Sequence, residues 1–222
     1  MLTDTGSQFL RWIDTAHSLS HLPWYSRFRV VIDLFYFAVL REEQQYMQAV
    51  EEAGKQATRD APEWMAKLMM EMHANPSDHL GSIYQEASVN DKKRLAQYFT
   101  PDGVAAAMAA MTLADIHEEQ FTKAGGLKIH EPSCGTGVMC IHAARLINEE
   151  FGQWGLNRTS FTLVDKDILC CKIALLQMLW LPYPVAEVVV MHGDSLRREV
   201  WMEARFGRGT PPSHTRIVRK TQ

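Results

Sequence analysis

The stretch from residue 127 to residue 139 constrains the fold more than any other part of the chain. It reads Leu-Lys-Ile-His-Glu-Pro-Ser-Cys-Gly-Thr-Gly-Val-Met, a short apolar run ending in Glu131 and then a small-residue loop with Gly135 and Gly137. A helical pattern follows from Val138 to about residue 150. Strand, glycine loop and helix in this order are typical of a ligand-binding turn. Glycine lets a ligand approach the backbone, and the helix N-terminus presents unpaired N–H groups.

A second strand–helix unit and a third strand follow the glycine loop and its helix. Residues 161–164 and 186–190 are β-type runs, and a helical pattern of apolar residues separates them. Alternating strands and helices predict a doubly wound parallel sheet with right-handed crossovers. Ligands bind such sheets beyond the carboxyl ends of the strands. We expect a site there, built from Glu131–Gly137, Asp165–Asp167 and Asp194.

The first third of the chain has only helical periodicity. The spacing predicts a short helix over residues 8–17 and longer helices over 24–53, 62–74 and 78–88, with Gly54 ending the first long one and Pro62 opening the next. We therefore expect three parts: an α-helical N-terminal subdomain over 1–88, a ligand-binding α/β domain over 89–200, and a basic, flexible tail over 201–222.

Composition narrows the class of protein. The 222 residues are 46% hydrophobic and 22% charged with a formal net charge of −3, so no global basic signature indicates nucleic acid, although a local basic face stays open. The four cysteines form no C-x-x-C pair, which favours reduced, buried thiols; a zinc site with His130 or His142 is an alternative. No signal peptide is evident, and the most apolar run, 30–40, is too short for a bilayer. We expect a cytoplasmic protein without membrane partners or a metal.

The charge at the loop favours one cofactor over others. Cys140 occupies the third glycine position of a G-x-G-x-x-G loop, and no phosphate-clamping G-x-x-x-x-G-K-[ST] occurs. Glu131 would repel a pyrophosphate but attract a cation. An acid after the second strand, here Asp165, suits a ribose diol. Together these residues favour S-adenosylmethionine, which carries an ammonium and a sulfonium, over NAD.

The sequence of this loop resembles a motif of a known family. Glu-Pro-Ser-Cys-Gly-Thr-Gly at 131–137 is similar to the D/E-P-x-C-G-T-G motif of adenine-N6 DNA methyltransferases, above all the modification subunits of type I restriction systems and short phage or plasmid relatives. Further segments resemble that family in the same order, from residue 78 to 196: Leu80–Tyr84, Gln97-Tyr-Phe-Thr-Pro101, Asp165-x-Asp167 with Ala174 and Gln177, and Gly193-Asp-Ser-Leu196.

The resemblance implies a Rossmann-like fold and roles for individual residues. Thr100 and Pro101 would contact the methionine end of S-adenosylmethionine, with Phe99 packing nearby. Glu131 would bind its ammonium, and the loop residues Ser133, Gly135 and Gly137 would approach it through the backbone. Asp165 would hold the ribose hydroxyls, and Asp194 would accept a hydrogen bond from the adenine amino group. Simpler interpretations are helix capping for Thr100 and Asp194 and a plain turn for the glycines.

The family's catalytic D/N/S-P-P-Y/F/W motif is where the resemblance fails. In the family its polar group and prolyl carbonyl accept hydrogen bonds from the target amine, and its aromatic ring stacks on a flipped base. Here the matching region reads Thr210-Pro211-Pro212-Ser213, without the amide or acid and without the aromatic. Residues 201–208 favour helix over strand, and 207–222 reads as a disordered basic tail. The expected sheet is therefore incomplete at its C-terminal side.

Two functions remain open on the sequence. One is S-adenosylmethionine-dependent methylation of adenine N6 in duplex DNA, on a flipped base. The other is a catalytically inactive or truncated relative that binds the cofactor or DNA as a regulator, a partner subunit or a homodimer. Gly193-Asp-Ser-Leu196 also spells a lipase-type signature, but no downstream Asp-x-x-His accompanies it.

Overall fold

The computed structural model describes residues 2–87, 100–207 and 210–220, the last range by its backbone. Contacts divide the chain into two compact units. One contains residues 1–75 and 79–99, and the other contains residues 76–78 and 100–222. In the described residues, none of the helices has both the length and the apolar character needed to cross a bilayer.

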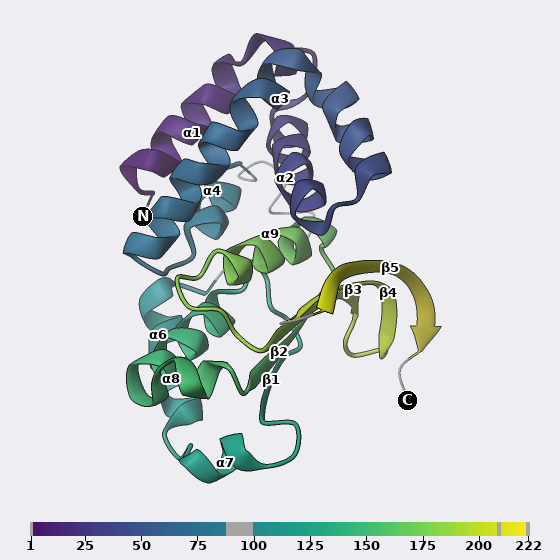
Figure 1. Ribbon diagram of the computed structural model, residues 1–222. Helices are drawn as coiled ribbons and strands as arrows, with labels where there is room; N and C mark the ends of the chain where they lie inside the picture. The colour runs from purple at the N-terminus through teal and green to yellow at the C-terminus, as the bar shows by residue number, and fades with distance from the viewer. Residues whose placement is uncertain (1, 88–99, 208–209, 221–222) are drawn as a thin grey trace. The chain divides into compact units, whose positions relative to one another are not determined.

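The first unit is helical (Figure 1). Its elements are α1 (Asp4–Thr15), the 3-10 turn η1 (His17–Leu19), α2 (Trp24–Leu40), α3 (Glu43–Ala74) and α4 (His79–Ala87). Large side chains fill its centre: Phe9, Phe28, Phe35, Leu68, Met72 and Tyr84 are all at most 2% exposed. Met72 of α3 thus belongs to the packed core, while Met70 of the same helix stays 71% exposed.

Two helix boundaries predicted from periodicity are wrong. The helix expected over 24–53 is broken at Arg41, which adopts a left-handed conformation with φ 58° and ends α2. Gly54 has a non-helical backbone (φ 73°, ψ 169°) that interrupts α3, in agreement with the predicted stop, whereas Pro62 lies inside α3 instead of opening a helix. The apolar spacing continues across Arg41 and Pro62. A single residue in a left-handed conformation, such as Arg41, does not change that spacing, so periodicity cannot detect it.

The second unit contains a five-stranded sheet in the order β1-β2-β3-β4-β5. Its first three strands, β1 (Leu127–Glu131), β2 (Thr159–Asp165) and β3 (Glu187–Asp194), run parallel. Its helices are α6 (Asp102–Leu113), α7 (Glu118–Thr122), α8 (Val138–Leu156) and α9 (Ile168–Leu179). The crossovers α8 and α9 pack on the strands that they connect, as expected for right-handed β-α-β units. The predicted Rossmann-like α/β fold is confirmed.

The C-terminal segment differs from the predicted tail. β4 (Glu199–Gly207) pairs antiparallel with β3, and β5 (Thr210–Lys220) pairs antiparallel with β4. The prediction of an unstructured segment over 201–222, with helix-favouring residues at 201–208, is therefore wrong for these strands. Val200 and Ala204 are buried on the sheet, and tertiary contacts of this kind override the weak helical propensity of Met202, Glu203 and Ala204.

Candidate functional site

The carboxyl edge of the three parallel strands brings the predicted cofactor residues together. Glu131 is the last residue of β1, Asp165 the last of β2 and Asp194 the last of β3. The register pairs Glu131 with Leu163 and Asp165 with His192, so all three acids lie at the same edge of the sheet. The glycine loop follows β1 directly and leads into α8.

Asp165 holds the glycine loop against the end of β2. Its Oδ2 accepts a hydrogen bond from the backbone N–H of Gly135 at 2.8 Å, and its Oδ1 accepts one from the N–H of Asp167 at 2.8 Å. The loop is also fixed by the N–H of Cys134, which donates to the carbonyl of Val164 at 2.9 Å. Burial raises the pKa of Asp165, while the N–H groups of Asp167 and Gly135 oppose the shift. The backbone N–H of Lys166 also donates to this carboxylate, which leaves about one of its four lone-pair sites for a hydroxyl donor.

The carboxylate of Glu131 can accept further hydrogen bonds. Its Oε1 accepts a hydrogen bond from the N–H of Ser133 at 3.2 Å, which orders the start of the loop. Glu131 is half-buried, and a carboxylate at this position would attract a cation. Ser133 itself is exposed. These contacts fit the ammonium-binding role expected of Glu131.

The backbone conformation at position 137 requires a glycine. It is the N-cap residue of α8, with φ 98° in the left-handed region. A Cβ at this position would lie 3.3 Å from the Cβ of Ala174 in α9, which is tighter than an ordinary contact. Gly135 also has a positive φ, 52°. The loop therefore needs glycine for its conformation and for close packing of α8 on α9.

A buried polar network lies beneath the loop. Asp78, Thr136 and Gln177 are all at most 7% exposed. The hydroxyl of Thr136 donates to Asp78 Oδ2 at 2.7 Å, and Nε2 of Gln177 donates to Asp78 Oδ1 at 2.7 Å and to the carbonyl of Thr136 at 2.8 Å. The network ties residues 76–78, the glycine loop and α9 together. Asp78 was predicted only as the first residue of a helix, because nothing local signals a partner 58 residues away.

A second network fixes α6 on α8. Oδ1 of Asp102 accepts hydrogen bonds from the hydroxyl of Ser77 at 2.8 Å and from Nε2 of the buried His142 at 3.0 Å. Partial burial raises the pKa of Asp102, but the hydrogen bonds from Ser77 and His142 outweigh it and lower the value overall. The sequence named His142 only as an alternative zinc ligand, and periodicity could not reveal a partner 40 residues away.

Asp194 caps a turn. Its Oδ1 accepts the N–H groups of Leu196 at 3.1 Å and Arg197 at 3.0 Å, and Lys166 Nζ approaches Oδ2 at 2.9 Å. The hydrogen bond from Lys166 and the turn N–H groups lower the pKa of Asp194. Lys166 is largely exposed and links the ends of β2 and β3. Asp194 therefore caps a turn and not a helix, and an adenine amino group would share this carboxylate with Lys166.

The start of α6 also differs in detail from the expectation. The helix spans Asp102–Leu113, and Pro101, not Thr100, occupies its N-cap position. Thr100 is half-buried and Pro101 is exposed. Phe99, with the rest of residues 88–99, lies outside the described residues.

Thr210, Pro211 and Pro212 are not brought to the glycine loop. Thr210 pairs with Gly207, and Gly207 pairs with Glu187, the first residue of β3. Asp194 is at the other end of β3. At about 3.3 Å per residue, the length of β3 separates the two positions by roughly 20 Å. The register therefore places this segment at the amino edge of the parallel strands.

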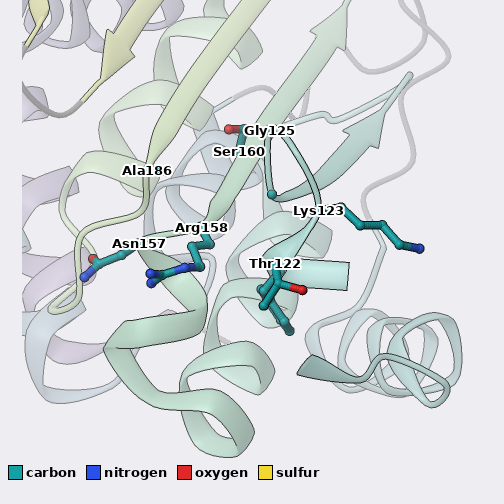
Figure 2. Close-up of a pocket in the computed structure, with 9 residues that line it drawn as sticks. Thr122, Lys123, Gly125, Asn157, Arg158, Ser160 and Ala186 are labelled. Atoms are coloured by element: carbon teal, nitrogen blue, oxygen red, sulfur yellow. The ribbon is translucent and has the colours of Figure 1, made fainter. Parts of the chain in front are cut away.

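A surface pocket also lies at the amino edge (Figure 2). Its volume is about 490 Å³. It is lined by residues at or just before the amino ends of β1, β2 and β3: Phe121, Thr122, Lys123, Gly125, Gly126, Asn157, Arg158, Ser160 and Ala186. Figure 2 shows the side chains of Lys123 and Arg158 extending away from each other. Arg158 lies over the ring of Trp154, 4.8 Å from its centroid. The pocket is therefore separate from the cofactor residues and does not focus charge on one point.

The cysteines support a structural role. All four, Cys134, Cys140, Cys170 and Cys171, are free and buried. Burial raises the pKa of each thiol, which keeps it protonated. Across the described ranges, the structure has no group of three or more His, Cys, Asp or Glu side chains able to hold a metal ion.

Comparisons with known proteins agree with this geometry. A family model described as N-6 DNA methylase matches residues 75–208, more than half of the chain and a range that includes Asp78 and every described cofactor residue above. No curated protein matches significantly. A solved structure from Listeria monocytogenes, titled a candidate class I S-adenosylmethionine-dependent methyltransferase, is similar with a TM-score of 0.41 and 15% identity over 87% of this chain. This chain spans 55% of that protein's length. The chain therefore belongs to the N-6 DNA methylase family, and its cofactor is accordingly S-adenosylmethionine.

Proposed function

We propose that this chain binds S-adenosylmethionine at the carboxyl edge of β1–β3 and serves in methylation of adenine N6 in DNA. One observation carries the proposal: Glu131, the glycine loop and Asp165 form one hydrogen-bonded corner within the segment that matches the N-6 DNA methylase family. In it, Glu131 receives the ammonium of the cofactor, Gly135 and Gly137 admit it to the backbone, and Asp165 accepts the ribose hydroxyls.

Bound there, S-adenosylmethionine would supply an electrophilic methyl group. The amino group of a flipped adenine would form the new N–C bond as the S–CH₃ bond breaks, and the nitrogen would release a proton to water. The chain contributes position and desolvation to this step. Groups that would hold the adenine amine were expected at Thr210–Pro212, and the register supports no such role for them.

A methyl-transfer assay tests the proposal. Purified protein is incubated with methyl-labelled S-adenosylmethionine and duplex DNA of varied sequence, and modified bases are identified after digestion. Label on adenine N6 that is lost in Asp165→Ala supports the proposal. Label on cytosine or on protein alone contradicts the adenine assignment.

A second candidate function is favoured by the position of Thr210 at the amino edge. In it the chain binds the cofactor without turnover and acts as a regulator or a partner subunit. Wild-type binding of S-adenosylmethionine, with no label transferred to any DNA by this chain alone, would favour this candidate over the first.

A further inference from the structure

We propose that Lys166 and Asp194 together recognise the adenine ring of S-adenosylmethionine: Asp194 accepts a hydrogen bond from the amino group, and Lys166 donates one to a ring nitrogen beside it. Lys166 then selects the base of the cofactor, whereas Glu131 and Asp165 bind its ammonium and its ribose. The inference rests on the proposed function, because it concerns the same cofactor at the same edge of the sheet.

The position of Lys166 is set by the two strands that end beside it. Lys166 directly follows Asp165, the last residue of β2, and its carbonyl oxygen accepts a hydrogen bond from Nε2 of His192 at 3.1 Å. The register pairs Asp165 with His192, and Asp194 lies two residues further along β3. Neighbouring strands are about 4.8 Å apart. Because the base of a nucleoside is bonded directly to its ribose, Lys166 and Asp194 lie where the base of the cofactor is expected, next to the proposed ribose acceptor.

The described donors leave one acceptor site on the carboxylate of Asp194. A carboxylate can accept about four hydrogen bonds. Oδ1 accepts the N–H groups of Leu196 at 3.1 Å and Arg197 at 3.0 Å, and Oδ2 accepts Nζ of Lys166 at 2.9 Å. Nε of Arg197 is 3.7 Å from Oδ2, which is too long for a hydrogen bond. The remaining site is therefore on Oδ2, beside the ammonium of Lys166.

An acceptor with a donor next to it matches the edge of adenine. The amino group of adenine is a donor, and the ring nitrogen on either side of it, N1 or N7, is an acceptor. The amino group can donate to the remaining site on Asp194, while the ammonium of Lys166, which has three N–H donors, turns one of them toward the ring nitrogen. A base with an oxygen in place of the amino group would bring that oxygen against the carboxylate. The pair therefore suits adenine better than hypoxanthine.

Lys166 can make this contact without disturbing the fold. Its side chain is 69% exposed, whereas that of Asp194 is 5% exposed. An ion pair with an exposed lysine contributes little to stability, and the lysine stem is flexible. The carboxylate, in contrast, is fixed by two backbone N–H groups of its own turn. The pair thus combines a fixed acceptor with an adjustable donor.

Titration calorimetry with analogues of S-adenosylhomocysteine tests the inference without any turnover. The probes are S-adenosylhomocysteine itself and its 1-deaza and 7-deaza analogues, in which a C–H replaces N1 or N7. Wild type should bind one of the two analogues about tenfold more weakly than the parent compound, because a hydrogen bond from a charged donor is lost. Lys166→Met should bind the parent and both analogues with equal affinity. Each comparison is a ratio measured on one protein, so an unfolded fraction cancels out of it.

Arg197→Met is the matched control. It removes a cation near the same carboxylate, but one that is too distant for a hydrogen bond, so it should keep the analogue difference of wild type. Three results would overturn the inference alone: equal binding of all three compounds by wild type, a difference that persists in Lys166→Met, or its loss in Arg197→Met as well, which would indicate a general effect of charge. If wild type does not bind S-adenosylhomocysteine at all, the proposed function is contradicted and the inference falls with it.

Discussion

The two ends of β3 differ in how the chain is held there. At the carboxyl end, Asp194, Lys166, Asp165 and the glycine loop are connected by directed hydrogen bonds, with the buried Asp78 network beneath the loop. At the amino end, the Thr210 segment is held by the antiparallel pairing of β4 and β5. Hydrogen bonds therefore hold in place the groups expected to bind a methyl donor. The groups expected to bind an acceptor base lie at the other end of β3.

The largest expected effect is on the buried network. Asp78→Ala removes the acceptor of both Thr136 and Gln177 and leaves the Gln177 amide short of a partner. We expect a loss of about 3 kcal/mol in unfolding free energy, since hydrogen bonds to a buried charge are strong and an unmet donor is costly. Urea unfolding followed by circular dichroism measures it. Asp115→Ala removes an exposed acid of the same unit and should change little; an equally small effect of Asp78→Ala would contradict the network's role.

The second-largest expected loss of unfolding free energy is that of Gly137→Ala. The new Cβ is forced into a left-handed backbone and a 3.3 Å approach to Ala174, at a cost of about 1 to 3 kcal/mol. Cofactor affinity should fall with it. Gly103→Ala is the matched control, because nothing lies within 4 Å of its Cβ position and alanine favours a helix by up to about 1 kcal/mol. Similar stability of the two variants would show that the loop tolerates a side chain.

Asp102→Ala should reveal a smaller, pH-dependent contribution. The folded-state pKa of Asp102 is lowered, so its stabilisation is present above the unfolded-state pKa and is lost as the pH falls through the folded-state value. Asp102 is about half exposed, which limits the effect to less than about 1 kcal/mol. Wild type should therefore lose more stability than Asp102→Ala between neutral pH and acid below the usual aspartate pKa. Parallel pH curves for the two proteins would exclude this linkage.

The smallest expected effect is at the amino edge. A double variant, Thr210→Ala with Pro212→Ala, should leave affinity for S-adenosylmethionine unchanged, because the register keeps these residues a strand length from the glycine loop. Calorimetry of the double variant measures this. A marked loss of affinity, with the free energy of unfolding unchanged, would mean that the two ends of β3 are coupled. It would contradict their separate roles.

The parallel half of the fold could be predicted from the sequence because its signals are local. The apolar run at 127–131, the glycines and the acids at strand ends each mark a structural position within a few residues. The β4–β5 hairpin could not be predicted, since burial of Val200 and Ala204 against the sheet outweighs local helical propensity. Asp78 was missed for a related reason: its partners Thr136 and Gln177 are distant in sequence and meet it only in the folded chain.

Titration calorimetry with S-adenosylmethionine tests the central claim most directly. Wild type should bind, and Asp165→Ala should not, because the variant loses both the ribose acceptor and the hydrogen bond that holds Gly135. Asp115→Ala should bind as wild type does. Binding by wild type that disappears in Asp165→Ala is the predicted result; no binding by wild type, or equal binding by both proteins, would contradict the assignment of this corner as the cofactor site.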